Sequence, residues 1–404
     1  MSTGILYHGL GVRGHVHEST HFVRGSIFFW VRQEPESWRC SACGSADVIG
    51  RGTETRFFRC VSLGRKQIWM VLPVPRLECH QCGVVRQAAI PFARPRCTYT
   101  KSFETYVLDL CRLMTMLDVA RHLGVSWYLV KQIQARDLAK RFAKPKLKKL
   151  RQIAIDEISI GKGHRYLTVV QDLETGRVVY VGEGKGADAL KSFWKRLHAS
   201  HARVRAVAID MSKAYIAAVK KHLPKAVLVF DRFHIVKLFN EKLSDLRREL
   251  HREASTLLEK QVLKGTRWLL LKNPENLDER RNEKQRLADA LRLNEPLATA
   301  YYMKEDLRQF WDQPTKATAR RVLADWVARA QASGIRILQG LAKTAAAYRE
   351  GILAWYDFPI STGPLEGTNN KIQTMKRRSY GFRDIEFFKL KILAAHESKW
   401  ALVG

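Results

Sequence analysis

Long hydrophobic runs are absent from this sequence. The longest apolar stretches, such as 27–31 and 268–271, hold four or five residues, whereas a membrane-spanning helix needs about 18 to 20. We therefore exclude helical membrane spans and predict a soluble protein with no membrane partner. Residues 1–12 lack a charged leader followed by an apolar stretch, so we also expect no secretory signal.

Cysteine and acidic residues are both scarce. Seven cysteines, four of them in two CxxC pairs, do not fit an oxidised disulfide framework and indicate a reducing, cytoplasmic compartment and a metal site. Lys and Arg number 70 against 39 Asp and Glu, which leaves a net charge of +31. This excess predicts a polyanionic partner and argues against a small neutral substrate as the main ligand.

The length and the pattern of the chain predict several domains. At about 150 residues per domain, the 404 residues correspond to two to four domains. The first 95 residues are strand-like and rich in Gly or Pro, and a helical pattern begins near Lys101. Residues 140–149 hold six Lys or Arg and no acid, and Pro145 disfavours a helix there because it restricts Lys144.

A mixed α/β sheet is predicted after this basic segment. β-rich apolar runs occupy 152–160, 166–172, 178–183, 204–210 and 226–230, and helical stretches at 187–197 and 213–221 separate the last three runs. Residues 233–355 are almost wholly helical in pattern. Residues 363–400 predict one or two further helices with a break near Gly381.

The two CxxC pairs predict a structural zinc site. Four thiolates form a closed tetrahedral site with no position left for water, and the ligands would be Cys40, Cys43, Cys79 and Cys82. Cys60 lies between the pairs, His80 could replace one thiolate, and four free buried thiols are the alternative. Zinc binding is worth about 10 to 16 kcal/mol in such modules, so the metal would hold together a domain too small to fold alone.

Residues 116–133 have the pattern of a helix-turn-helix. The turn at Gly124 separates an apolar face of Leu117, Val119, Ala120 and Leu123 from a second helix, capped by Ser126, that turns Val130 and Ile133 inward. The second helix would present to a major groove Trp127, Tyr128, Lys131, Gln132 and Gln134. The flanking basic segment would contact phosphates through Lys140, Arg141, Lys144, Lys146, Lys148 and Lys149. The alternative is a plain helical hairpin within a core.

Carboxylates interrupt or end the apolar runs of the predicted sheet. Asp156 lies within the first run and Asp210 ends the fourth. A buried charge is costly unless it is paired or bound to metal, so if these runs are neighbours the two aspartates face each other at a site. Alternatively, Asp156 is a strand-end residue beside a solvated Glu157, and Asp210 caps the helix that begins near Ser212. Asp231 is a rival for the second position because it too ends an apolar run.

A third acid comes from a predicted helix near the C-terminus. Gly363 would be its N-cap, Pro364 its first residue and Glu366 part of its first turn. The same polar face carries Asn370, Gln373 and Arg377. Alternatively, Glu366 complements the helix dipole or closes a capping box.

Three converging carboxylates would favour a pair of divalent cations. The carboxylates repel one another, and two cations about 3.5 to 4 Å apart relieve the repulsion. One cation would deprotonate a water or a DNA 3′-hydroxyl for attack on a phosphodiester, and the other would stabilise the leaving oxygen. Oxygen ligands favour Mg²⁺ or Mn²⁺ over zinc.

The order of these motifs resembles the bacterial insertion-sequence DDE transposases of the ISL-three family. The likeness covers 40–388 and is carried by the CxxC pairs, the helix-turn-helix, AIDEIS, AIDMS, the DRFH at 231–234 and, most specifically, LEGTNNKIQTMKRRSYGFR at 365–383. It implies a multidomain α/β protein with an RNase H-like (retroviral-integrase-like) catalytic core whose triad is Asp156, Asp210 and Glu366. It also implies a cytoplasmic bacterial enzyme, associated with the nucleoid when bound to DNA.

Composition and the resemblance together divide the chain into six parts. These are a zinc-binding β domain (1–97), a helix-turn-helix domain (98–143), a basic linker (144–150), the first part of the core (151–239), a helical insertion domain (240–358) and C-terminal core helices with the catalytic Glu (359–404). The insertion accounts for the 156 positions (366 − 210) between Asp210 and Glu366.

The resemblance implies an activity on double-stranded DNA. The N-terminal domains would bind the terminal inverted repeats of an insertion sequence, and the enzyme would cleave its ends and join the 3′-hydroxyls to target DNA by two-metal phosphoryl transfer. A homodimer or higher oligomer is expected. The alternatives are a transposase-derived DNA-binding regulator without catalysis and an RNase H-like, structure-selective nuclease.

Other residues are candidates for contact with DNA. Phosphate clamps near Glu366 would be Lys371, Lys376, Arg377, Arg378 and Arg383, unless they form an ordinary solvated face. Tryptophans that could stack on a flipped base, although their helical spacing favours core packing, are Trp268, Trp311, Trp326 and Trp355. We expect His234 to be a hydrogen-bonded structural residue, with a role near the scissile phosphate left open.

Overall fold

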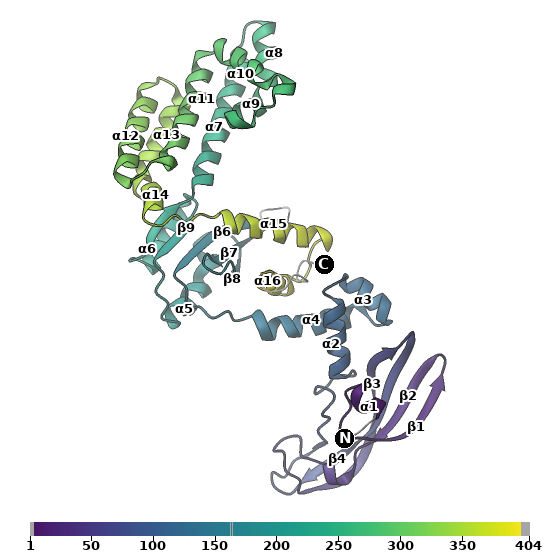
Figure 1. The fold of residues 1–404 in the computed structure, drawn as a ribbon. Helices are drawn as coiled ribbons and strands as arrows, with labels where there is room; N and C mark the ends of the chain where they lie inside the picture. The colour runs from purple at the N-terminus through teal and green to yellow at the C-terminus, as the bar shows by residue number, and fades with distance from the viewer. Residues whose placement is uncertain (1–3, 162, 164, 397–404) are drawn as a thin grey trace. The chain divides into compact units, whose positions relative to one another are not determined.

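The computed structural model describes residues 4–161, 163 and 165–396, apart from the side chains of 258 and 259. The chain forms two compact units, Met1–Arg141 and Phe142–Leu402, and each is described by itself (Figure 1). Within the described residues, no helix has the length and apolar character that crossing a bilayer requires.

The first unit contains a five-stranded sheet. Its strands follow the order β1-β2-β4-β3, with β5 paired to β4. We predicted short strand-like runs, but β3 and β4 form one long hairpin, because alternate side chains of β4 from Ile68 to Val74 all enter the core. The strands are β1 Val16–Val23, β2 Ser26–Arg32, β3 Val48–Leu63, β4 Lys66–Cys79 and β5 Val85–Gln87.

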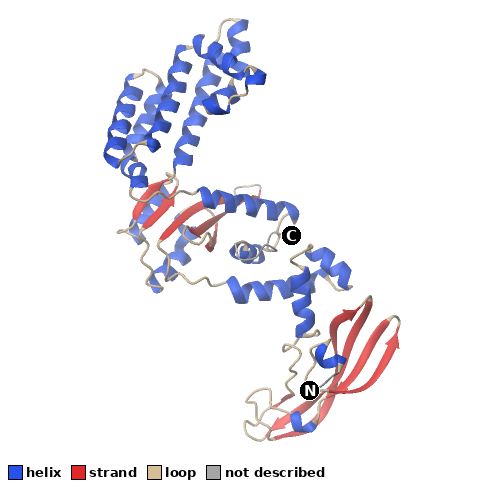
Figure 2. Ribbon diagram, in the orientation of Figure 1, coloured by secondary structure: helices blue, strands red, loops and turns tan. Residues whose placement is uncertain are grey.

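Helices complete this unit. A short helix, α1 Ile5–His8, lies near its beginning, and the 3₁₀ turn η1 Pro35–Ser37 precedes the first CxxC pair. Beyond the sheet, three helices follow one another closely, as the helical pattern predicted (Figure 2). They are α2 Lys101–Leu110, α3 Met116–Leu123 and α4 Trp127–Phe142.

The second unit is built on the mixed sheet that the sequence predicted. The five strands follow the order β10-β9-β6-β7-β8; β6, β7 and β8 are antiparallel neighbours, whereas β9 and β10 run parallel to β6. The strands are β6 Gln152–Gly161, β7 Arg165–Asp172, β8 Val178–Glu183, β9 Ala206–Ile209 and β10 Val227–Phe230. The helical segments between them are η2 Ala187–Leu190, α5 Lys191–Ala199 and α6 Lys213–His222.

The two faces of this sheet pack into different cores. Ile155 and Ile209 belong to the core shared with α5 and α6, whereas Ala154 and Ala208 belong to the core shared with α15 Gly363–Arg378 and α16 Ile385–Ala394. Figure 1 shows α15 lying along the sheet. The helices α15 and α16 are separate, which confirms the predicted break near Gly381, but α15 begins at Gly363 with Thr362 as its N-cap, not with Gly363 as the cap.

A helical region lies between β10 and α15. Its first helix, α7, runs without a break from Arg232 to Glu253, so the proposed border at 239/240 falls inside one helix. Trp326 and Trp311 are buried in its core, whereas Trp268 is exposed. The helices are α7 Arg232–Glu253, α8 Leu257–Gly265, α9 Arg267–Leu271, α10 Glu283–Arg292, α11 Glu295–Arg308, α12 Lys316–Ala332, α13 Arg336–Ala347 and α14 Arg349–Leu353.

Candidate active site

Three aspartates stand at the same level of three neighbouring parallel strands. Ala154 of β6 is in register with Ala208 of β9, and Ile209 of β9 is in register with Phe230 of β10. Continuing this register places Asp156 opposite Asp210, and Asp210 opposite Asp231. Neighbouring strands lie about 4.8 Å apart, so this register brings all three carboxylates together toward the C-terminal ends of the three parallel strands.

All three aspartates belong to the same face of the sheet. Side chains alternate between faces along a strand, and Asp156, Asp210 and Asp231 each follow by two positions a residue of the α15 core: Ala154, Ala208 and Val229. This is the face that α15 covers, and α15 carries Glu366. The structure therefore brings the predicted triad of Asp156, Asp210 and Glu366 to one side of the sheet, together with Asp231.

Asp156 is half-buried and held by amide donors. The backbone N–H of Glu157 donates to Asp156 Oδ1 at 2.8 Å, and Asn369 Nδ2 donates to Asp156 Oδ2 at 2.9 Å. The sequence predicted Asn370 on the polar face of α15 but not Asn369. Both residues lie within about one helical turn of Glu366, so spacing does not distinguish them. Gln373, which was selected, donates to the Ser159 carbonyl at 2.7 Å.

Glu157 points to the opposite face and has a different role. Tyr215 of α6 donates its hydroxyl to Glu157 Oε1 at 2.7 Å. The same hydroxyl is 3.0 Å from the hydroxyl of Thr168. Glu157 is therefore a hydrogen-bonded acid, and Asp156 lies inside β6, so the alternative of a strand-end Asp156 beside a solvated Glu157 is wrong.

Asp231 is almost fully buried and anchors two elements. It caps α7 by accepting a hydrogen bond from the Phe233 N–H, and its other oxygen accepts one from the hydroxyl of Thr362, the residue before α15. Asp210 accepts a hydrogen bond from the Ser212 N–H at 2.9 Å, but the N-cap of α6 is Ser212, so the alternative that Asp210 caps this helix is wrong. Both aspartates thus have local structural bonds as well as a place in the carboxylate row.

His234 contributes a nitrogen to this cluster. One ligand atom each from Asp231, His234 and Glu366 lie within 4.8 Å of one another. His234 Nε2 is buried and makes no hydrogen bond within the described residues, so the expectation of a hydrogen-bonded structural histidine is not met at this atom. An orphaned buried nitrogen beside two carboxylates is suited to a metal ligand.

The carboxylates raise one another's pKa. Burial raises the pKa of the Asp156 carboxyl, and the negative charges of Asp210 and Glu157 raise it further. Burial also raises the pKa of Glu366, with contributions from Asp231 and Asp156. A cation among these groups would reverse both effects by stabilising the charged forms. Glu366 is the fourth residue of α15, and the N-cap Thr362 makes no side-chain capping hydrogen bond, which disfavours the alternative that Glu366 closes a capping box.

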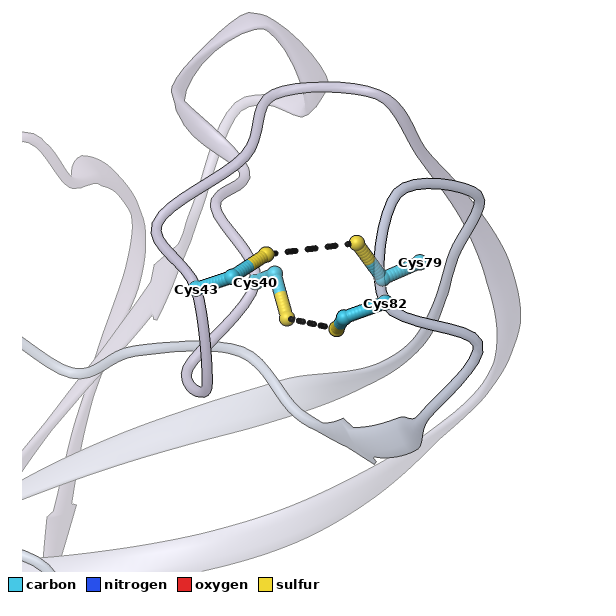
Figure 3. A group of neighbouring side chains, drawn as sticks. All are labelled: Cys40, Cys43, Cys79 and Cys82. Carbon is cyan, nitrogen blue, oxygen red and sulfur yellow. Dashed lines mark hydrogen bonds between the residues drawn. The ribbon is translucent and has the colours of Figure 1, made fainter.

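The four paired cysteines converge in the first unit (Figure 3). Sγ of Cys40 lies 3.7 Å from Sγ of Cys82, and Sγ of Cys43 lies 3.6 Å from Sγ of Cys79. A tetrahedron with metal–sulfur bonds of about 2.3 Å has edges of about 3.8 Å, so these separations fit a metal centre and are too long for disulfides. N–H groups of Cys43 and Ala42 lower the pKa of the Cys40 thiol to about 6.

The two neighbouring candidates stay outside this cluster. Cys60 is buried in the core of the sheet, with its thiol 3.6 Å from the Phe58 carbonyl, and His80 is exposed. The four-thiol set is therefore the one that the fold assembles.

The helix-turn-helix has the predicted turn and cap. Gly124 adopts the left-handed conformation at the end of α3, and Ser126 Oγ accepts a hydrogen bond from the Leu129 N–H at 3.2 Å. Val130 and Ile133 are fully buried, but Leu117 is exposed and does not join the apolar face. Met116 is buried beside the predicted face residues instead.

The outer face of α4 is largely as predicted. Trp127 and Tyr128 are exposed, Gln132 is exposed, and the half-buried Lys131 places its ammonium 5.6 Å from the centre of the Trp127 ring. The prediction that Gln134 faces a major groove is wrong, because this residue is buried. The basic residues of the following segment are all exposed: Lys140, Arg141, Lys144, Lys146, Lys148 and Lys149.

Two family models match this chain. One, described as a transposase and named for the DDE transposases of ISL3, matches residues 153–392; the other, described as the helix-turn-helix domain of transposase family ISL3, matches residues 88–137. These two matches show that the protein is a DDE-type DNA transposase. The chain belongs to transposase family ISL3, as the order of its motifs indicated.

Individual relatives are similar over most of the chain. The transposase for insertion sequence element IS1001 of Bordetella parapertussis is 33% identical over 375 residues, covering 92% of this chain and 91% of that protein. The transposase for insertion sequence element IS1557 of Mycobacterium tuberculosis is 31% identical over 372 residues, covering 85% and 82%. A solved structure of the Drosophila P element transposase strand transfer complex matches 74% of this chain and 92% of that chain, with a TM-score of 0.40 and 11% identity.

Proposed function

We propose that this transposase cleaves DNA at the ends of an insertion sequence and joins the resulting 3′-hydroxyls to target DNA. The observation that carries the proposal is the row of aspartates toward the C-terminal ends of β6, β9 and β10, with Glu366 on α15, which covers the same face of the sheet. Acidic side chains gathered from such distant positions are costly unless cations bind there. The triad that we propose is Asp156, Asp210 and Glu366.

The sheet supports an RNase H-like core. Three antiparallel strands followed by two parallel strands, in the order β10-β9-β6-β7-β8, place the first strand in the centre of the sheet. Asp156 on that central strand then has Asp210 on the adjacent strand and Glu366 on a helix of the covering layer. This arrangement is the expected one for the proposed core, with α7–α14 as its helical insertion.

The oxygen-rich donor set fits Mg²⁺ or Mn²⁺. When bound, such cations supply a more acidic nucleophilic hydroxyl and neutralise charge on the leaving oxygen. The residues of the chain position these ligands: Asn369 holds one oxygen of Asp156, and Thr362 holds Asp231. His234 and Asp231 are candidates for additional ligands because their atoms lie beside Glu366.

Cationic side chains on and beyond α15 would receive DNA phosphates. Lys371, Arg377 and Arg378 are exposed, as is Arg383, and Lys376 is half-buried. No carboxylate in the described part of the chain forms an ion pair with them. Their charge is therefore available to a phosphate backbone near the proposed catalytic Glu366.

The first unit would recognise the element ends. Its exposed α4 residues, Trp127, Tyr128, Lys131 and Gln132, would reach bases in a major groove, and the basic segment 140–149 would contact phosphates. Zinc held by the four cysteines would stabilise the sheet beside these helices. We further propose a homodimer or higher oligomer, because two element ends must be processed together.

The test is a cleavage and joining assay with Asp210→Asn. Purified protein is mixed with Mg²⁺, a labelled DNA fragment that flanks its coding region, and a plasmid target. We expect Asp210→Asn to reduce cleavage and joining by at least about a thousandfold, a loss typical of essential catalytic groups, with binding to the labelled end nearly unchanged.

Three outcomes would count against the proposal. Equal loss of binding and joining in Asp210→Asn would indicate a structural role for this aspartate. Cleavage without joined product in the natural protein would favour a nuclease. Full activity of Asp210→Asn together with inactivity of Asp231→Asn would move the second catalytic position to Asp231.

A further inference from the structure

A basic groove lies on the helical region, away from the carboxylate cluster. Its walls come from the C-terminal half of α7, from α8, from the start of α9 and from the start of α13, and it encloses about 1090 Å³. Figure 1 shows α8 and α9 beside the end of α7 that is remote from the sheet. Eight Lys and Arg line the groove against two carboxylates, so its surface is strongly positive.

Most of these cations have no ion-pair partner among the residues that the structure describes. Asp245 pairs with Lys242 and Arg248, and Glu249 lies 3.9 Å from Arg336. In the part of the chain that the structure describes, no carboxylate pairs with Lys260, Lys264 or Arg267. Burial lowers the pKa of Arg247, and the positive charges of Arg267 and Arg248 lower it further. The cations therefore repel one another, and an anionic ligand would relieve that repulsion.

A tryptophan stands open at the edge of the groove. Trp268 is 66% exposed, whereas Trp326 and Trp311 of the same region are almost completely buried. The Arg267 guanidinium lies 4.9 Å from the centre of the Trp268 ring. Trp268 also lines a second hollow of about 560 Å³, which includes Lys272, Arg281 and Arg286 together with Glu283, the partner of Lys272. The indole thus borders two hollows and is largely open to solvent.

We propose that this groove binds a DNA strand and that Trp268 stacks on an unpaired base of that strand. A positive groove that follows the backbone, combined with an exposed aromatic ring, is the chemistry that recognises single-stranded or unstacked nucleic acid. Lys260, Lys264 and Arg267 would contact phosphates. The part that this binding would have in transposition rests on the proposed function.

The length of α7 relates the groove to the carboxylates. Asp231 caps α7, and groove residues Lys242 to Arg252 lie 11 to 21 positions further on, which is about 16 to 32 Å at 1.5 Å per residue. A DNA strand rises about 3.4 Å per nucleotide. The unpaired base would therefore lie about five to nine nucleotides from a phosphate at the carboxylate cluster.

The first test measures binding of the full chain to two DNA probes without divalent metal. One probe is a fully paired duplex and the other is the same duplex with one unpaired aminopurine, whose fluorescence falls when it stacks on an aromatic ring. We expect Trp268→Ala to weaken binding to the second probe by about tenfold and to abolish the fluorescence change, with Trp268→Phe restoring part of both. Tyr302→Ala, which removes an exposed aromatic ring of α11 elsewhere in the region, is the matched control.

The second test measures the charge contribution. The slope of log affinity against log salt is negative, and each lost phosphate contact makes it less steep by about 0.9. The double variant Lys260→Ala with Lys264→Ala should therefore make it less steep by about 1.8. The control removes two exposed cations of α12 and α13, through Arg321→Ala with Lys343→Ala, and should leave the slope unchanged. Groove variants that match their controls in both tests would overturn the proposal, as would a Trp268→Ala loss that is equal for paired and unpaired probes.

These tests do not depend on catalysis. Asp210→Asn protein should show the same preference for the unpaired probe as the natural chain. If the joining assay fails but this preference is present, the proposed function is wrong and the groove still binds DNA. If joining succeeds and the preference is absent, the groove proposal alone is wrong.

Discussion

At the scale of single residues, the carboxylates of the site are positioned mainly by neutral hydrogen-bond donors. Asp156 receives an amide hydrogen from Asn369, and Asp231 receives a hydroxyl hydrogen from Thr362. Amides and hydroxyls fix the orientation of a carboxylate without neutralising its charge, whereas an arginine or lysine would do both. The negative charge therefore stays available to a cation, and the raised pKa values of Asp156 and Glu366 are consistent with this.

Asn369→Ala tests this positioning. We expect DNA cleavage to fall by about 10- to 100-fold, the usual effect of losing a hydrogen bond to a metal ligand, and the Mg²⁺ concentration needed for half-maximal rate to rise. Asn370→Ala removes the same group from an exposed neighbouring position and should have little effect on either quantity. Equal rates for the two variants would show that the Asn369–Asp156 bond has no role in metal binding.

At the scale of elements, α7 and α14 connect the helical region to the end of β10, next to the aspartates. Asp231 follows β10 directly and begins α7, while α14 packs against Phe230 of β10. A Cβ atom on Gly351 of α14 would lie 2.3 Å from two carbons of the Phe230 ring. Only a glycine permits this close approach, so the contact fixes the position of the residue next to Asp231.

Gly351→Ala is expected to destabilise the second unit. The added methyl group must displace the Phe230 ring, and such overpacking costs about 1 to 3 kcal/mol. Gly340→Ala is the matched control, because its Cβ would meet no atom within 4 Å and alanine favours the helix by about 0.5 to 1 kcal/mol. Urea unfolding followed by circular dichroism measures both; stabilisation by Gly351→Ala would contradict the close contact.

At the scale of the whole molecule, the chain consists of two units with separate cores. The first unit has the four-thiol cluster and the helix-turn-helix, and the second has the carboxylate cluster and the helical region. Cys43 and Cys82 are exposed members of the thiol cluster, so their side chains add little packing energy. The contribution of these cysteines to stability should therefore come mainly from a bound metal.

Metal removal should consequently affect the two units differently. We expect a strong zinc chelator, or Cys43→Ser, to remove hydrogen-exchange protection from β3 and β4, because apparent zinc binding is worth about 10 to 16 kcal/mol in small zinc modules. Protection of β6 and β9 should stay within error of the untreated protein. Readdition of Zn²⁺ should restore the chelated protein but not Cys43→Ser. Unchanged protection of β3 and β4 after chelation would exclude a structural zinc.

The sequence by itself determined the local features of this protein. Strands β6–β10, the turn at Gly124, the Ser126 cap and the CxxC pairs follow from short-range periodicity, from conformational preferences of single residues and from ligand spacing, all of which are encoded within about one helical turn or strand. The motifs also sufficed to identify the family. These features do not depend on which distant segments later come into contact.

The tertiary structure alone decided which residues meet. The bond between Asn369 and Asp156 joins positions 213 residues apart, and neither helical spacing nor charge distinguishes Asn369 from Asn370. In the same way, the burial of Trp326, the exposure of Trp268 and the place of His234 beside Glu366 depend on how helices pack. Packing is set by long-range complementarity between whole elements, and that information is not present in any single segment of the chain.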